Sequence, residues 1–412
     1  MTERTERTTC VVAGGGPAGM VLGLLLARAG VDVTVLEKHG DFLRDFRGDT
    51  VHPSTMRLLD DLGLGERFAR LPASHVDRIE FPAPDGSNVV MGDFRRLPGR
   101  HKYIAMVPQW DLLDMLAAAG KEEPSFHLRM NTAAVDTIVE RGRVVGVRYE
   151  GPDGAGELRA DLVVAADGRW SVLRKAAGLH PHEHPVPIDT WWFRLPRDQG
   201  VEVAGLAARM ADGQLAIAIN RTDYFQIALL ARKGIDAQLR ADGIEPFRAR
   251  IAKLFPELAD VVDTVKDMDD VKFLDVRLNK LPRWYVDGLL CIGDAAHAMS
   301  PAGGVGINLA IQDAVAAARL LAGPLLRHYV READLARVQR RRRFPTALVQ
   351  GLQRRLHDGL FAPVVEGTRN TMPTALVTVL RRLPAIRFVP AYLIGIGLRP
   401  ERAPEFAKRV SG

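Results

Sequence analysis

Six residues near the N-terminus, GGGPAG at positions 14–19, combine a regular glycine spacing with a place between a strand pattern and a helix pattern. Gly14, Gly16 and Gly19 fit G-x-G-x-x-G directly after an apolar run. The first glycine permits a tight turn, the second lets the backbone approach a pyrophosphate, and the third lets the helix pack against the strand. Because a helix N-terminus attracts negative charge, this spacing predicts a dinucleotide-binding site.

A carboxylate follows the second apolar run, VDVTVL at residues 31–36. Glu37 lies 18 residues after Gly19, where its side chain can accept hydrogen bonds from ribose hydroxyls. A carboxylate at this point disfavours a phosphorylated ribose. The acid therefore favours FAD or NAD over NADP at this site.

Two further glycine–aspartate pairs follow strand-like runs, in AADGRWSVLR at 165–174 and in GDAAHAMSPAGGVGIN at 293–308. Taken alone, an Asp-Gly pair after a strand is only a turn signal. The second stretch is more informative, because its glycines can bring backbone N–H groups against a ligand at a helix N-terminus. An aspartate at a strand end can also hold a polyol hydroxyl.

The elements that position these motifs are predicted from hydrophobic periodicity. Strand, glycine turn, helix and strand within about 30 residues make a βαβ unit and imply a parallel sheet. A less regular middle region, with a turn at 84–87, predicts a second, mostly antiparallel domain. We expect strands at 9–13, 31–36, 77–81, 88–91, 158–165, 215–219, 224–230 and 286–292, two strands within 131–149, and helices at 17–29, 55–62, 109–119, 244–254 and 306–322.

The composition limits the class of protein to which the chain can belong. The 412 residues, 47% hydrophobic and 26% charged, suggest two or three soluble globular domains and exclude a disulfide-stapled, collagen-like or mostly disordered chain. Cys10 and Cys291 lie inside apolar runs and favour a reducing compartment. No leader-like segment or uninterrupted apolar span is visible, so we expect a cytoplasmic protein. The net charge of +6 is modest and suits a nucleotide-phosphate ligand better than nucleic acid.

As a set, the three motifs resemble those of the single-component (group A) FAD-dependent aromatic monooxygenases, typified by p-hydroxybenzoate hydroxylase. The resemblance implies an α/β fold: a Rossmann-like FAD-binding domain of the GR2 type, an inserted and mostly antiparallel substrate domain, and a helical C-terminal region. The expected boundaries are 1–70, 106–178 and 282–325 for the FAD domain, 71–105 and 179–281 for the substrate domain, and 326–412 for the C-terminal region.

The resemblance also implies roles for particular residues. Glu37 would hold the adenosine ribose, Asp294 and Gln109 the ribityl chain, and Arg47, ten residues after Glu37, would contact FAD. The loop around Pro301 would line the isoalloxazine ring, and the pair Asp167-Gly168 is associated with both FAD and the pyridine nucleotide. The complete expected cofactor set is Gly14, Gly16, Pro17, Ala18, Gly19, Glu37, Lys38, Arg47, Gln109, Val135, Asp167, Gly168, Asp294, Pro301, Gly303, Gly304, Gly306, Ile307 and Asn308, the last two through backbone groups at the pyrimidine edge.

The implied activity is monooxygenation. NADPH or NADH would reduce FAD transiently, O₂ would add as a flavin C4a-hydroperoxide, and one oxygen atom would enter a phenolic or polycyclic aromatic ring. Epoxidation, Baeyer–Villiger insertion and simple oxidation on the same scaffold stay open, as does a non-catalytic flavoprotein that sequesters an aromatic ligand. No catalytic base and no metal ligands are assigned. The expected partners are a small aromatic substrate and O₂, with neither nucleic acid nor stable membrane insertion, and a homodimer is left open.

Several residues carry two interpretations. His297 is a tempting acid–base group, but a histidine bonded to backbone near the flavin is favoured. His52 is favoured as structural, and Trp191-Trp192-Phe193 as sheet core over a stacking platform. The basic run 340–343 is interpreted as a solvated helix face. The apolar stretch 388–398 is expected to pack on the core or in a dimer, with a membrane contact as the alternative.

Overall fold

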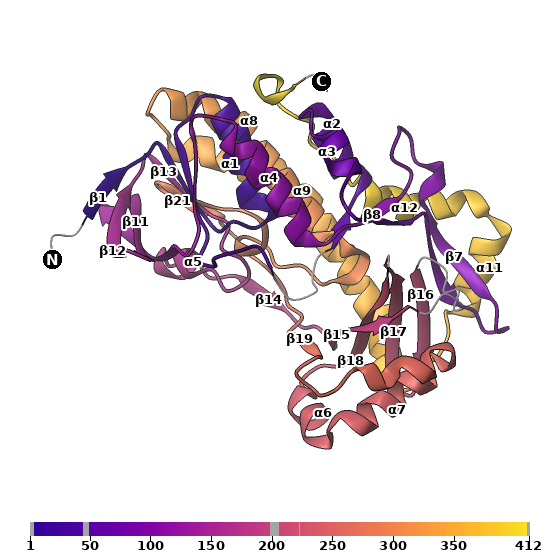
Figure 1. Cartoon of the computed structure of the whole chain (residues 1–412). Helices are drawn as coiled ribbons and strands as arrows, with labels where there is room; N and C mark the ends of the chain where they lie inside the picture. The colour runs from indigo at the N-terminus through magenta and orange to yellow at the C-terminus, as the bar shows by residue number, and fades with distance from the viewer. Residues whose placement is uncertain (1–3, 44–48, 198–205, 222, 410–412) are drawn as a thin grey trace.

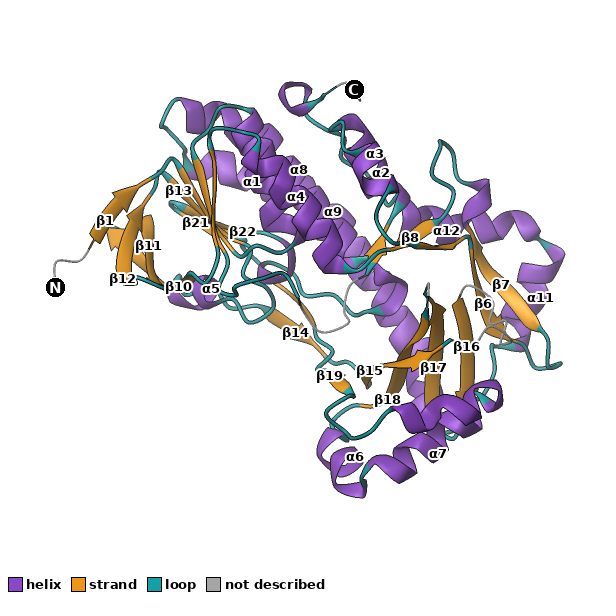
Figure 2. Cartoon of the chain, viewed as in Figure 1, coloured by secondary structure: helices purple, strands orange, loops and turns teal. Residues whose placement is uncertain are grey.

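The computed structural model describes residues 4–43, 49–197, 206–221 and 223–409. Two bodies of sheet lie on either side of a long helical layer, and the C-terminal helices run along the outside of the second body (Figure 1). Figure 2 shows the helices packed side by side between the two groups of strands.

The first body is built on a six-stranded sheet of order β21-β22-β13-β2-β3-β9, parallel except at β21–β22. Its central strands are fully buried, which suits their short β-branched runs. The sheet contains β2 (Cys10–Ala13), β3 (Val33–Leu36), β9 (Phe126–Arg129), β13 (Leu162–Ala165), β21 (Tyr285–Val286) and β22 (Leu289–Cys291).

Apolar helices cover this sheet, and α1 packs against both α4 and α8. The cover consists of α1 (Pro17–Arg28), α4 (Gln109–Lys121) and α8 (Gly306–Leu326). Among the described residues, one helical segment, Ala302–Leu326, is long and apolar enough to cross a membrane. However, 72% of its apolar window is buried inside the protein, as expected for a core helix.

Two small sheets flank this body. A four-stranded sheet, β1-β12-β11-β10, adjoins the short helix α5, and a three-stranded sheet, β4-β8-β5, adjoins α2 and α3. Their bounds are β1 (Arg4–Arg7), β10 (Ala133–Glu140), β11 (Arg143–Gly151), β12 (Gly154–Arg159), α5 (Val172–Ala176), β4 (Thr50–Val51), β5 (Ser74–Val76), β8 (Ile104–Met106), α2 (Pro53–Asp61) and α3 (Gly65–Ala69).

The second body is a seven-stranded sheet of order β19-β15-β18-β17-β16-β6-β7. It joins strands from two distant parts of the chain. The pair β16–β6 is parallel, and all other strand pairs of this sheet are antiparallel. Its strands are β6 (Arg78–Pro82), β7 (Asn88–Asp93), β15 (Ile188–Pro196), β16 (Leu206–Ala211), β17 (Gln214–Asn220), β18 (Tyr224–Arg232) and β19 (Lys272–Leu274). A separate antiparallel pair, β14 (His182–His184) and β20 (Leu278–Lys280), lies between the two bodies.

Helices close the second body on both sides. One outer layer holds α6 (Asp236–Asp242), α7 (Ile244–Leu254) and the 3-10 segment η2 (Pro256–Thr264), which share an apolar cluster with Trp191 and Phe193. The C-terminal region contributes α9 (Glu332–Leu356), the π-helical turn η5 (His357–Phe361), α10 (Ala362–Val365), α11 (Thr374–Arg382), η6 (Pro384–Arg387), α12 (Phe388–Gly395) and η7 (Glu405–Ala407). Three further 3-10 turns are η1 (Phe94–Arg96), η3 (Gly293–Ala295) and η4 (Ala302–Gly304).

Two expected strands were wrong in their continuity. The run 158–165 is divided at Ala160 and Asp161 between β12 and β13, which belong to different sheets. The run 286–292 is interrupted at Gly288, where φ is +82° and the chain reverses from β21 into β22. Apolar periodicity could not detect these breaks, because apolar residues stand close to each break on both sides: Leu158 and Leu162 at the first, and Val286 and Leu289 at the second.

Candidate functional site

The three glycine motifs meet at one edge of the six-stranded sheet. They follow β2, β13 and β22, which are neighbouring parallel strands. Gly14 has φ +107°, and a Cβ there would overlap the carbonyl oxygen of Ala166. A Cβ on Gly293 would lie 3.6 Å from the Cβ of Ala18. Ligands of open α/β sheets bind at such carboxyl edges, so this edge is the candidate site.

The first motif leaves open space beside Gly16, where a pyrophosphate would approach the backbone. Gly16 is the N-cap of α1 and has no side chain that could cap the helix, and Pro17 occupies the first turn. A Cβ on Gly16 would meet nothing within 4 Å, whereas one on Gly19 would overlap the carbonyl oxygen of Gly14. The third glycine is thus required by packing, and the second keeps open a cradle at the positive end of a helix dipole. Ala18 lies buried in the same first turn.

Glu37 lies beside this cradle at the end of β3. Its Oε2 accepts a hydrogen bond from the backbone N–H of Gly15 at 2.9 Å, and its Oε1 accepts one from that of His39 at 3.0 Å. The side chain is buried, while the neighbouring Lys38 is exposed. These bonds fix the carboxylate next to the glycine turn, where it can meet a ribose.

The second motif positions a buried carboxylate. Oδ2 of Asp167 accepts hydrogen bonds from the backbone N–H groups of Val172 and Leu173 at 2.9 and 3.2 Å. Its Oδ1 is buried without a hydrogen-bond partner among the described residues, and burial raises the pKa of this carboxyl. Gly168 has φ +85° and open space around it. An unfilled acceptor beside an open glycine fits a ligand hydroxyl or N–H group. Val135 lies on β10, which packs against α5 of this motif.

The third motif places Asp294 in η3 with its side chain 30% exposed, 3.5 Å from the guanidinium of Arg169. The following loop, from Pro301 to Gly306, has positive φ at Gly303 and Gly304, +79° and +63°. Only glycine adopts such angles readily, so the loop can present its backbone to a flat ligand. These residues fit the ribityl and ring positions that the sequence predicted.

His52 contacts the backbone of this loop. It is fully buried, with Nε2 2.9 Å from the carbonyl oxygen of Gly304 and Nδ1 2.8 Å from that of Ile394 in α12. Thr50 also donates its hydroxyl to the Gly304 carbonyl, at 2.9 Å. His52 thus contacts backbone through both ring nitrogens, which fits the structural interpretation.

Asn308, in the first turn of α8, uses its side chain within the protein. Its Oδ1 accepts hydrogen bonds from the hydroxyls of Ser54 and Thr55 at 2.8 and 2.9 Å. Ile307 precedes it in the same turn. Gln109 begins α4 directly after β8 and Pro108. Arg47, the remaining predicted contact, lies outside the described residues.

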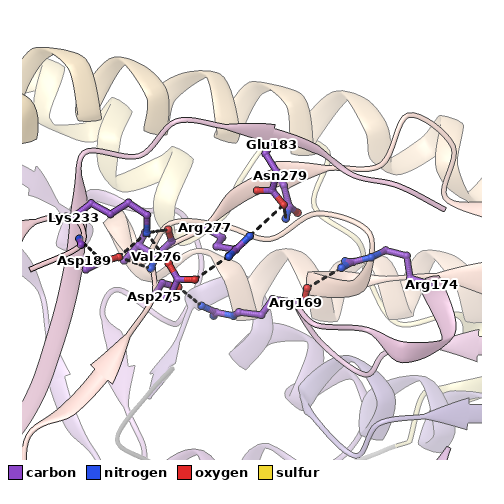
Figure 3. A network of polar contacts seen from close by, with 10 residues as sticks. Arg169, Arg174, Glu183, Asp189, Lys233, Asp275, Val276, Arg277 and Asn279 are labelled. Carbon is purple, nitrogen blue, oxygen red and sulfur yellow. Dashed lines mark hydrogen bonds and ion pairs between the residues drawn. The ribbon is translucent and has the colours of Figure 1, made fainter. Parts of the chain in front are cut away.

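A polar network ties the second motif to the seven-stranded sheet (Figure 3). Arg169 donates to the carbonyl oxygen of Asp275 at 3.1 Å, and Arg174 donates to the carbonyl oxygen of Arg169 at 2.9 Å. The Asp275 carboxylate accepts from Lys233 at 2.6 Å and from Arg277 at 2.9 Å. Lys233 and Arg277 extend the network to Asp189, Val276, Glu183 and Asn279. Arg169 therefore contacts both Asp294 and the loop between β19 and β20.

His297 has a different partner from the one expected. Its Nε2 lies 2.6 Å from Oδ2 of Asp313 in α8 and does not bond to backbone, so that expectation was wrong. Asp313 also accepts from the backbone N–H of Gly293 at 3.1 Å and from Nε of Arg342 at 3.0 Å. Burial opposes ionisation, but the neighbouring His297 and Arg342 lower the pKa of Asp313. This group braces the third motif from inside the protein.

The basic run 340–343 was also misinterpreted at one position. Arg342 is completely buried in α9, because it pairs with Asp313. Arg341 pairs with Glu401 at 2.6 Å. A run of arginines on one helix turn covers all directions, so one member faces inward even when the others are solvated. An aspartate inside the apolar pattern of α8 was the available signal for Asp313, since a buried carboxylate requires a partner.

The tryptophan pair separates across the sheet. Trp191 is fully buried on the α7 side and donates its indole N–H to Asp236 at 2.7 Å. Trp192 faces the opposite side, where it packs against an apolar cluster that includes Met299 and Val305 of the third motif. Its indole N–H is buried and has no hydrogen-bond partner among the described residues. Trp191 is thus core, and Trp192 lies on the sheet face whose apolar cluster includes residues of the glycine loop.

Comparison with known protein families and sequences gives a consistent result. A family model described as "FAD binding domain" matches residues 7–351. A 6-methylpretetramide 4-monooxygenase of Streptomyces rimosus is 37% identical over 359 residues, which cover 85% of this chain and 84% of that protein. A 12-dehydrotetracycline 5-monooxygenase/anhydrotetracycline 6-monooxygenase of Streptomyces rimosus is 31% identical over 326 residues; the match covers 75% of this chain and 61% of that longer protein.

Solved structures resemble the whole architecture. The OxyS anhydrotetracycline hydroxylase from Streptomyces rimosus matches with a TM-score of 0.76 and 25% identity, over 97% of this chain and 78% of that one. The fold is also that of PqsL from Pseudomonas aeruginosa, described as a probable FAD-dependent monooxygenase, with a TM-score of 0.73 and 23% identity over 90% and 100% of the two chains.

Proposed function

The chain belongs to the FAD-binding domain family of flavin-dependent monooxygenases, and on that premise we propose that it inserts one oxygen atom of O₂ into a phenolic, polycyclic aromatic substrate. The observation that carries the proposal is the placement of Trp192, on the sheet face that meets the glycine loop of the third motif. The relatives named for 6-methylpretetramide, 12-dehydrotetracycline and anhydrotetracycline support the same substrate class.

FAD supplies the redox chemistry when bound, because no amino-acid side chain can activate O₂ for this transfer. We expect Gly16 and the α1 N-terminus to hold its pyrophosphate, Glu37 its adenosine ribose and Asp294 its ribityl chain. The loop at Gly303 and Gly304 would lie along the ring system. NADPH or NADH is the expected electron donor.

The protein's own contribution is positioning and exclusion of water. Trp192 offers a flat apolar ring with one unfilled donor at its edge. Such a side chain can stack on an aromatic substrate and donate to a ring oxygen, so that one face of the substrate meets the flavin loop. No described side chain is assigned as a base, so deprotonation of a phenolic substrate is not attributed to a residue. A cytoplasmic location and a homodimer stay predictions.

The test is steady-state oxidation of NADPH and NADH by the FAD-loaded protein with a panel of fused-ring phenols. We expect at least one phenol to accelerate oxidation and to gain an oxygen atom that carries isotope label from O₂. Flavin reduction that no panel member accelerates would count against the proposal, and a product labelled from water would refute it.

Trp192→Phe tests the placement of the substrate. The variant keeps a ring but removes the N–H donor, so we expect about tenfold weaker substrate binding with FAD affinity unchanged. Trp191→Phe is the matched control, because its indole faces the opposite side of the sheet. It should alter stability without a specific effect on substrate affinity.

A further inference from the structure

The outer face of the C-terminal helices exposes an apolar surface. Five large hydrophobic side chains within residues 376–389 are exposed. The other exposed large hydrophobic side chains of the described residues are spread more widely along the chain. We call the set of five the α11–α12 patch: Leu376, Val379, Leu383, Ile386 and Val389, which are 39–54% exposed. Figure 1 shows α11 and α12 beside β7, at the edge of the second body.

The patch is not the inward face of these helices. Val377 and Leu380 of α11 are buried in the cluster that covers the seven-stranded sheet, and Phe388 packs inward from α12. The segment is therefore apolar on both sides, whereas a surface helix ordinarily carries polar residues outward. Exposed apolar side chains grouped in this way are typical of a surface that contacts something outside the chain.

The charged residues of the segment that carries the patch are all basic. The segment from α11 through α12 contains three arginines, Arg381, Arg382 and Arg387, and no acidic residue. Arg382 is exposed, and within the described ranges no carboxylate lies at ion-pair distance from it. The acid at this edge, Asp85, is already bonded to Arg381 at 2.6 Å. The surface therefore combines an apolar ridge with uncompensated positive charge.

Charge decides between the possible occupants. In a two-fold symmetric dimer, the same patch would face itself and bring Arg382 and Arg387 toward their own copies. That arrangement would place like charges together at the rim of an apolar contact, which is unfavourable. An anionic lipid surface satisfies both features, because apolar side chains enter the boundary between headgroups and acyl chains while arginines meet phosphates.

We propose that the α11–α12 patch binds peripherally to anionic lipid bilayers. The inference does not depend on the reaction proposed above. The segment is also connected to the glycine loop, because the carbonyl oxygen of Ile394 in α12 contacts His52, which contacts Gly304. Docking here would bring the loop side of the protein close to apolar compounds dissolved in the bilayer.

The test is co-sedimentation of the FAD-loaded full chain with two kinds of vesicle. One kind is phosphatidylcholine alone, and the other is equal parts phosphatidylcholine and phosphatidylglycerol. We expect binding to the anionic vesicles that weakens with added salt, and little binding to the neutral ones. Absence of binding to the anionic vesicles by a monomeric protein would overturn the proposal and leave the patch to a protein partner.

A matched pair of double variants makes the test specific. Leu383→Glu/Val389→Glu alters patch side chains that are 54% and 52% exposed, and Leu326→Glu/Val139→Glu makes the same changes at 51% and 55% exposed positions elsewhere. We expect the first variant to bind at least about tenfold less and the second to bind nearly as the wild type. Equal loss in both variants would overturn the proposal, since the effect would then be one of net charge.

Light scattering tests the remaining alternative, a dimer that forms through the α11–α12 patch. If the wild type is a dimer that Leu383→Glu/Val389→Glu dissociates, the patch is a contact between copies and the lipid proposal is wrong. Arg382→Glu should lower binding to the anionic vesicles about tenfold while leaving the mass in solution unchanged. An Arg382→Glu protein that binds as the wild type would also contradict the proposal.

Discussion

Substitution of Gly16 separates cofactor binding from folding. Gly16 has φ −73° and ψ −179°, which any residue can adopt, and a Cβ there meets no protein atom within 4 Å. Gly16→Ala should therefore leave the FAD-free protein as stable as the wild type, or more stable by about 0.4–1 kcal/mol through the unfolded chain. The added methyl group would occupy the cradle at the start of α1.

The expected loss appears only when FAD is bound. A hydrogen bond from a backbone N–H to a charged phosphate contributes about 1.5–3 kcal/mol, and the methyl group would displace the phosphates from at least two such donors. The total of about 3 kcal/mol or more corresponds to a roughly hundredfold rise in Kd. Flavin fluorescence titration would measure this Kd, and thermal unfolding with and without FAD would measure both stabilities.

Gly14→Ala and Gly19→Ala are the matched controls. They add the same methyl group, but it would overlap the carbonyl oxygens of Ala166 and Gly14. Both variants should lower the Tm of the FAD-free protein, which Gly16→Ala should not. A Gly16→Ala protein that binds FAD as tightly as the wild type would refute the placement of the pyrophosphate.

Three further predictions concern the supports of the site. Arg342→Met leaves the Asp313 carboxylate buried without its arginine and should cost about 3–5 kcal/mol in urea unfolding; a loss below about 1 kcal/mol would contradict the role given to this pair. His357 adjoins the third motif, with its Nε2 2.8 Å from the hydroxyl oxygen of Ser300. Burial lowers the pKa of His357 from 6.5 to about 4. Its stabilising effect is full above pH 6.5 and disappears as the pH falls through 4, so His357→Gln should unfold with a weaker pH dependence in that range; an unchanged profile would refute this. Arg169→Ala should weaken FAD retention on dialysis if Arg169 orients Asp294, and unchanged retention would show that it does not.

The motif residues were predictable from the sequence because their chemistry depends on local spacing. Gly14, Gly19 and Glu37 belong to one strand–helix–strand unit of the sequence, and the structure places them in that unit as expected. The family and the FAD-binding fold are confirmed by the comparisons. The roles of the individual residues stay predictions.

The supports of the site were not predictable in the same way. Asp313, Arg342 and Arg169 act through partners that are distant in sequence. The apolar pattern of α8 signals that Asp313 is buried, but nothing in the sequence shows which charged residue is its partner. The same reason explains Trp191 and Trp192. Alternation shows that they point to opposite faces of a strand, but not which face meets the glycine loop.

The order of strands in the six-stranded sheet has a consequence for how the chain is made. β13 pairs with β2 on one side and with β22 on the other, and β22 is residues 289–291. During synthesis, the first body therefore lacks a strand until most of the chain has emerged. Both hydrogen-bonding edges of β13 pair with strands that are distant in sequence, and such contacts form slowly. We expect folding to finish after translation of the third motif, so a nascent or truncated chain without it would expose an open sheet edge and be prone to aggregation.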